Sequence, residues 1–228
     1  MERGFFPPYA VESEEEEGRA GEGGDGGWNR GLVITVALVG AFYFGIKFIR
    51  YTLWSWTPYF LELNYGLAGD DAGYLSTLFD VGGFAGVIFA GVVSDRFFRG
   101  RRITISLLML VGMIGGCVLL ATLGKIGVVW VAVGLTLVGF MLFGPDSLLT
   151  GAGAIDMGNR RIALTCAATI NGLGAVGSVV QETVVSRVYD ANAGQVEPIF
   201  ILLVTAAVFS FGMLSMVHWR NRQGLSDL

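Results

Sequence analysis

Charge is the property that this sequence has least of. Only 15% of its 228 residues are Asp, Glu, Lys or Arg, whereas a soluble domain usually carries about a quarter. At the same time 53% of the residues are hydrophobic, and the mean hydropathy is +0.62. A soluble domain of this length cannot hide so much apolar surface in one core. The composition therefore excludes a soluble enzyme.

Residue types that carry catalytic or metal chemistry are equally scarce. The single histidine, His218, has no nucleophile, base or metal ligand near it in the sequence. Both cysteines, Cys117 and Cys166, fall in apolar runs without CxxC or Cys/His spacing, which predicts buried and unpaired thiols. No GxxxxGK(S/T) phosphate loop occurs. We therefore expect no enzyme activity, no cofactor, no metal site and no ATP-driven step.

What charge there is gathers at the N-terminus. Residues 1–27 hold eight acids and two arginines, a balance of -6, so that the other residues come to +2 within a total of -4. The run Glu14 to Glu17 and the Gly-rich stretch 21–27 cannot bury enough apolar surface to fold. We predict a disordered acidic cytosolic tail over 1–30, and nothing in the body indicates nucleic-acid binding.

Long apolar runs dominate the rest of the chain. A helix needs about 20 largely apolar residues to cross the bilayer core, and such runs occur at about 31–60, 72–93, 103–124, 128–149, 162–186 and 198–217. They predict an all-α polytopic membrane bundle, with a six-helix transmembrane domain over 31–220 and a cytosolic C-terminal tail over 221–228. Glycine stripes such as Gly82 to Gly86 and Gly112 to Gly116 indicate close helix packing in lipid.

The loops predict the orientation of this domain. Nine basic residues flank the spans on the side of the termini, against two, Lys125 and Arg187, on the other side; the nine are Arg30, Arg96, Arg99, Arg101, Arg102, Arg160, Arg161, Arg220 and Arg222. Positive charge favours the cytosolic side. We expect both termini in the cytosol, and the sequence is compatible with the endoplasmic reticulum, the plasma membrane or a plastid envelope.

Five ionisable residues fall within the spans: Lys47, Arg50, Asp80, Asp146 and Glu182. Each costs at least ~2.5 kcal/mol at membrane depth and is therefore a candidate functional group. The spacing of Lys47 and Arg50 places both cations on one helix face. Counting helical rise from the expected span ends puts Arg50 and Asp80 at the same depth.

This arrangement has two interpretations. In the first, Arg50 and Lys47 bind a phosphate dianion and Asp80 neutralises Arg50 when the site is empty. In the second, Arg50 and Asp80 are a structural pair and Lys47 snorkels outward. For Asp146 and Glu182 we favour a helix-end or interfacial carboxylate.

Uncharged residues near these cations are further candidates. Tyr51 and Trp54, with Trp56 and Tyr59, can line a cavity, although an aromatic belt at the interface explains the later ones equally well. Asn171 can bind substrate or make a helix-to-helix hydrogen bond.

The loop after the second span contains the most specific motif. It reads GVVSDRFFRGRR over 91–102. It resembles the signature loop of the major facilitator superfamily, in which a helix-packing glycine and an acidic residue followed by basic residues form a latch between access states. The resemblance assigns that latch to Gly91, Asp95, Arg96, Arg99, Arg101 and Arg102, and the fold to one half of a major facilitator superfamily transporter.

A narrower resemblance covers about 31–220. The stretches 71–102, 143–145 and 171–178 are similar to the C-terminal half of organophosphate:inorganic phosphate antiporters. The stretch 48–58 is similar to one that holds a phosphate-binding arginine in the glycerol-3-phosphate members. The resemblance thus implies a phosphate role for Arg50 and a switching carboxylate at Asp80, whereas the eukaryotic sugar-phosphate members look more similar at Lys47.

That family has twelve spans, so an N-terminal six-helix half is missing from this chain. Either the sequence is a fragment or incomplete gene model, or the half works with a separate partner or with itself. The resulting hypothesis is exchange of a phosphorylated small metabolite, glycerol-3-phosphate or a sugar phosphate, against inorganic phosphate by a rocker-switch motion. The alternatives are a transport-inactive half-length membrane partner and a transporter of another small solute.

Overall fold

The computed structural model describes residues 30–97, 102–151 and 160–223. The acidic tail expected over 1–30 lies almost wholly outside the described residues, as do Arg99 and Arg101 of the predicted latch.

Six long helices make up the described chain: α2 (Arg30–Tyr65), α3 (Gly69–Phe97), α4 (Arg102–Leu123), α5 (Val128–Gly151), α6 (Arg160–Ala191) and α7 (Glu197–Arg222). The short 3-10 helix η1 (Gly124–Ile126) follows α4, and no strand occurs in the described residues. Each long helix is long and apolar enough to span a membrane. The predicted all-α membrane bundle with six spans is confirmed. The first helix continues to Tyr65, beyond the expected end near residue 60.

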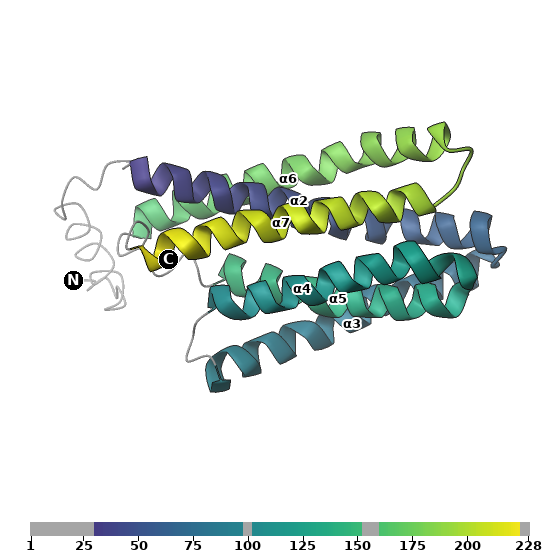
Figure 1. Ribbon diagram of the computed structural model, residues 1–228, viewed down its shortest axis with the longest axis horizontal. Helices are drawn as coiled ribbons and strands as arrows, with labels where there is room; N and C mark the ends of the chain where they lie inside the picture. Colours follow the sequence, from purple (N-terminus) through teal and green to yellow (C-terminus); the bar gives the residue numbers. More distant parts are fainter. Residues whose placement is uncertain (1–29, 98–101, 152–159, 224–228) are drawn as a thin grey trace, which may run out of the picture.

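The helices form two groups that run side by side. Figure 1 shows α2, α6 and α7 along one side of the bundle and α3, α4 and α5 along the other. Within these groups α2 packs mainly on α6 and α7, and α5 packs on both α3 and α4; the packing of α4 on α7 joins the groups. The start of α2 and the end of α7 meet at one end of the bundle, where the Arg220 Nη2 donates to the Gly31 carbonyl oxygen at 3.3 Å. An even number of crossings places these two ends together.

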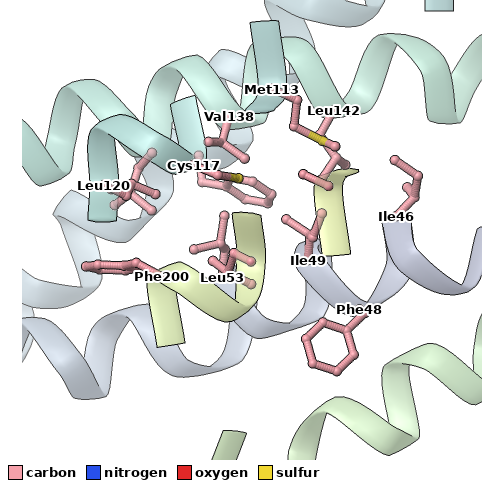
Figure 2. Packing of buried hydrophobic residues seen from close by; sticks show 14 of the residues in the cluster. Ile46, Phe48, Ile49, Leu53, Met113, Cys117, Leu120, Val138, Leu142 and Phe200 are labelled. Carbon is pink, nitrogen blue, oxygen red and sulfur yellow. The ribbon is translucent and has the colours of Figure 1, made fainter. Parts of the chain in front are cut away.

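The core between the two groups is built by branched, aromatic and sulfur-containing side chains. Ile49 and Leu53 of α2 face Met113 and Cys117 of α4, and Phe200 of α7 closes one side (Figure 2). Phe48 points from the opposite side of α2, toward α6. Cys117 and Cys166 are both buried free thiols, as the sequence predicted. The buried sides of α2 thus hold the helix that carries Lys47 and Arg50 in a fixed position.

Glycine allows α3 and α5 to approach until their backbones touch. A Cβ on Gly82 would collide with the Thr136 carbonyl oxygen, and one on Gly86 would collide with that of Phe140. From the other helix, Gly139 lies against the Phe79 carbonyl oxygen in the same way. The predicted role of the Gly82 to Gly86 stripe in close packing is confirmed. Such approach is favourable in lipid because van der Waals contact, not hydrophobic exclusion, holds membrane helices together.

Replacing Gly86 tests this packing. We expect Gly86→Ala to destabilise the protein by about 1–3 kcal/mol, because the added methyl group meets backbone that cannot turn aside. The melting temperature in mild detergent measures the effect. Gly115→Ala is the matched control, since no atom lies within 4 Å of its Cβ position, and a helical Gly→Ala change is otherwise stabilising by roughly 0.5–1 kcal/mol. Equal shifts for the two variants would contradict the packing role.

Candidate functional site

Two cations project from the most buried helix of the bundle. Lys47 and Arg50 lie on one face of α2 and are both partly exposed, although their neighbours Ile46 and Ile49 are fully buried. No helix of the described chain covers this face completely, and it continues through Tyr51, Trp54 and Ser55. We call these five residues, Lys47, Arg50, Tyr51, Trp54 and Ser55, the polar face of α2.

Arg50 is held by a carboxylate and an aromatic ring of α5. Its Nη1 lies 2.7 Å from Asp146 Oδ2, with side-chain exposures of 37% for Arg50 and 14% for Asp146. The guanidinium carbon lies 4.3 Å from the centre of the Phe143 ring, so that the planar group stacks on the ring and donates at its edge. The Tyr43 hydroxyl fixes this part of α5 by donating to the Asp146 carbonyl oxygen at 3.0 Å.

The predicted pairing of Arg50 with Asp80 is wrong in this structure. At about 1.5 Å per residue, Arg50 lies about 22 Å from the end of α2 at Tyr65, whereas Asp80 lies only about 16 Å from the start of α3 at Gly69. The depths differ because α2 is longer than expected. Asp80 is exposed and has no ion pair among the described residues.

Side-chain direction explains why Asp146 takes the place of Asp80. Helical side chains lean toward the N-terminus of their own helix, and α2 runs opposite to α3 and α5. Asp146 lies about 27 Å from the start of α5, deeper than Arg50, so the two side chains lean toward each other. Arg50 and Asp80 instead lean apart. The interpretation of Asp146 as a helix-end or interfacial carboxylate is therefore corrected.

Lys47 contacts α6. Its Nζ donates to Asn171 Oδ1 at 2.6 Å. The approach is close because Gly174 lies beside Lys47, with only 3.3 Å between its Cβ position and Lys47 Cδ. Of the two predicted roles for Asn171, the structure contains the helix-to-helix hydrogen bond, and Asn171 is still exposed. Lys47 is thus anchored beside Arg50 and does not extend away from the bundle.

The aromatic candidates lie beside the cations. Tyr51 and Trp54 are 37% and 61% exposed and pack edge to face, with ring centres 6.1 Å apart. Trp56 and Tyr59 instead pack with Phe60 and Tyr189 on the α6 side of α2. Of the four aromatic candidates, only Tyr51 and Trp54 therefore belong to the polar face of α2.

Glu182 of α6 is a candidate that the sequence interpretation set aside. It lies within α6, well before the end at Ala191, and is exposed. Trp56 Nε1 donates to its Oε2 at 3.1 Å, and Gln181 Nε2 donates to its Oε1 at 2.7 Å. A helix-end carboxylate does not describe this arrangement. The signal available in the sequence was the adjacent Gln181-Glu182 pair within an apolar span.

Comparison of the sequence with known proteins identifies relatives of this chain. No protein-family model matches the chain. A putative glycerol-3-phosphate transporter of Arabidopsis thaliana is 33% identical over 183 residues, which cover 75% of this chain and 34% of that protein. A glucose-6-phosphate exchanger of Mus musculus is 30% identical over 194 residues, 79% of this chain and 38% of that protein. A glycerol-3-phosphate transporter of Bacillus subtilis is 29% identical over 177 residues, which cover 75% of this chain and 38% of that protein.

The chain is a homologue of glycerol-3-phosphate transporters and sugar phosphate exchangers. It is a multi-pass integral membrane protein with six helices of membrane-spanning type in its described part. The matches cover 34% to 38% of the length of these relatives.

The latch expected from the family resemblance is described only at its two ends. Asp95 and Arg96 are exposed in the last turns of α3, and Arg102 begins α4. Apart from the backbone of its own helix, no atom of the described residues lies within 4 Å of the Cβ position of Gly91, and the close packing expected at this glycine stays a prediction. The latch function of these residues stays a prediction.

The described residues contain no candidate metal site. They include no group of three or more His, Cys, Asp or Glu side chains that could hold a metal ion. The chemistry that the polar face of α2 supports is recognition of an anion by Lys47 and Arg50.

Proposed function

We propose that this chain forms the cationic half of a membrane exchanger that carries a phosphorylated small metabolite against inorganic phosphate. The observation that carries the proposal is the pair of cations on the exposed polar face of α2, one held by Asp146 and one by Asn171. The names of the relatives support glycerol-3-phosphate or a sugar phosphate as the metabolite.

Phosphate binding at this site follows from the chemistry of the two cations. A guanidinium presents a planar fork of donors that suits two phosphate oxygens, and the Lys47 ammonium adds a second positive charge for a dianion. Asp146 holds one edge of the Arg50 guanidinium. An incoming phosphate group takes over these hydrogen bonds from Asp146, while Phe143 continues to support the face of the guanidinium.

Exchange follows from the cost of an uncompensated charge. A cation that passes through a closed, water-free state without a counter-charge costs several kcal/mol. Bound phosphate removes this cost in either direction. The Arg50–Asp146 pair removes only part of it in the empty protein, because Lys47 has a neutral partner in Asn171. The loaded protein therefore changes its access side faster than the empty one, which favours exchange over one-way transport.

Alternating access needs a second wall opposite the polar face of α2. We propose that a six-helix N-terminal half supplies it and that the two halves rock against each other. Charged groups at membrane depth require such a cavity, since lipid contact at Lys47, Arg50 or Glu182 would be costly. We also propose that the bundle end with Arg30, Arg96, Arg102 and Arg220 faces the cytosol, because basic residues favour that side.

Counterflow in liposomes tests the function. The purified protein, with any subunit that copurifies, is reconstituted into liposomes loaded with inorganic phosphate, and the uptake of labelled phosphate is followed. We expect uptake that requires internal phosphate and is inhibited by external glycerol-3-phosphate or glucose-6-phosphate. Uptake that is independent of internal phosphate would overturn exchange, and binding of neither phosphate nor organophosphate would overturn the site.

A further inference from the structure

Glu182 presents a negative charge that the phosphate site does not use. It lies within a membrane-spanning helix, is exposed, and has no cation within ion-pair distance among the described residues. A charged side chain that faces lipid within the hydrocarbon layer is costly, by about 2.5–3.5 kcal/mol at the centre of a spanning helix on insertion scales. Its exposed side must therefore face water or a polar ligand.

Neighbouring side chains hold this carboxylate in one orientation. Trp56 Nε1 occupies one oxygen and Gln181 Nε2 the other, and Gln181 is itself fully buried. The Ser55 hydroxyl lies 3.0 Å from Oε1 of Glu182 and 2.7 Å from the Tyr51 carbonyl oxygen, and its single proton serves only one of them at a time. An ionised carboxylate has about four acceptor sites. Glu182 therefore keeps acceptor capacity for a ligand hydroxyl.

The distance from the cations matches an elongated ligand. Ser55, which lies against Glu182, follows Arg50 by about 7.5 Å of helical rise on α2. The Arg50 side chain leans toward the start of α2, away from Ser55, which increases the separation. The exposed ring of Trp54 lies between them on the same face. The polar face of α2 thus presents two cations and an aromatic surface, and the Glu182 carboxylate of α6 lies against its Ser55 end.

We propose that Glu182 is a specificity-determining residue that accepts hydrogen bonds from hydroxyl groups at the sugar end of a hexose phosphate. This role rests on the proposed function, since it requires the phosphate group to lie at Arg50 and Lys47. The negative charge of Glu182 repels the phosphate end and so fixes the orientation of the ligand. Trp54 offers an apolar surface to the sugar ring between the two ends. Inorganic phosphate has no second end and does not reach Glu182.

Glu182→Gln tests whether the sugar end of the ligand is recognised separately from the phosphate end. The amide keeps the size of the side chain and an acceptor for Trp56, but it loses the charge that strengthens hydrogen bonds to hydroxyls. In reconstituted protein we expect the KM for glucose-6-phosphate to rise about tenfold, while the KM for phosphate self-exchange changes by less than about twofold. Asp190→Asn, which changes another exposed carboxylate of α6 without a side-chain hydrogen bond in the described chain, should leave both values unchanged.

Equal changes in both KM values, or no change in either, would overturn the role of Glu182. Phosphate self-exchange also reports whether the variant is folded. If Glu182→Gln loses both activities, Glu182→Asp is the second variant to measure. Retention of phosphate self-exchange with a raised KM for glucose-6-phosphate supports the role of Glu182. Loss of both activities by the same factor overturns it. Absence of phosphate self-exchange in the unmodified protein would instead overturn the proposed function itself.

Discussion

Arg50→Ala is expected to reduce phosphate counterflow by about 100-fold or more. Each hydrogen bond to a charged group contributes about 1.5–3 kcal/mol, and the guanidinium offers two of them to one phosphate group. At 1.4 kcal/mol per factor of ten, their loss predicts at least that reduction. The substitution also removes the ion pair between Arg50 and Asp146, and repulsion between the Asp146 carboxylate and phosphate adds to the effect. Initial rates of labelled phosphate uptake into liposomes measure it.

Arg50→Lys and Arg187→Ala are the controls for this experiment. Lysine keeps the charge without the planar fork, so we expect an intermediate rate. Arg187 is an exposed arginine of α6 outside the proposed site, and its replacement should leave counterflow within about twofold of the unmodified protein. Counterflow that survives Arg50→Ala undiminished would show that phosphate does not bind at this arginine.

Asp146→Asn is expected to tighten phosphate binding and to lower one-way transport relative to exchange. Asp146 competes with phosphate for Arg50 across a distance of 2.7 Å. Because the Arg50–Asp146 pair is only partly buried, its contribution to stability is about 1 kcal/mol. Phosphate no longer has to displace the Asp146 carboxylate in the variant, so phosphate should bind roughly fivefold more tightly. The empty protein then carries an unpaired guanidinium, and one-way efflux should fall about tenfold or more. Equilibrium binding and efflux into phosphate-free buffer give the two quantities.

Asp80→Asn distinguishes the pair that the structure contains from the pair expected from sequence. Asp80 has no ion pair in the described chain, so its replacement should change phosphate affinity by less than about twofold. If Asp80→Asn tightened phosphate binding and Asp146→Asn did not, Asp80 would be the competing carboxylate during transport. The two variants carry the same chemical change and therefore serve as controls for each other.

Helical periodicity and hydropathy determined most of the architecture from the sequence. Six apolar runs gave six membrane-type helices, because spanning length is a property of each segment alone. The three-residue spacing of Lys47 and Arg50 put both cations on one face of α2, since the geometry of a single helix fixes that relation. The stripe of Gly82 and Gly86 likewise predicted close helix packing, because small residues let helix backbones approach, and the structure shows that the partner is α5.

Tertiary structure decided which groups from different helices meet. Arg50 pairs with Asp146 and not with Asp80 because α2 extends to Tyr65 and because antiparallel neighbours send their side chains in opposite directions. Glu182 joins the polar face of α2 only through the packing of α6 on α2, where Gly174 and Gly177 set the distance. The relative height and rotation of two neighbouring helices depend on how they pack, and the sequence pattern of a single helix does not contain that information. The sequence by itself thus determined the spans and their charged residues, and the packing of the spans decided the partner of each charge.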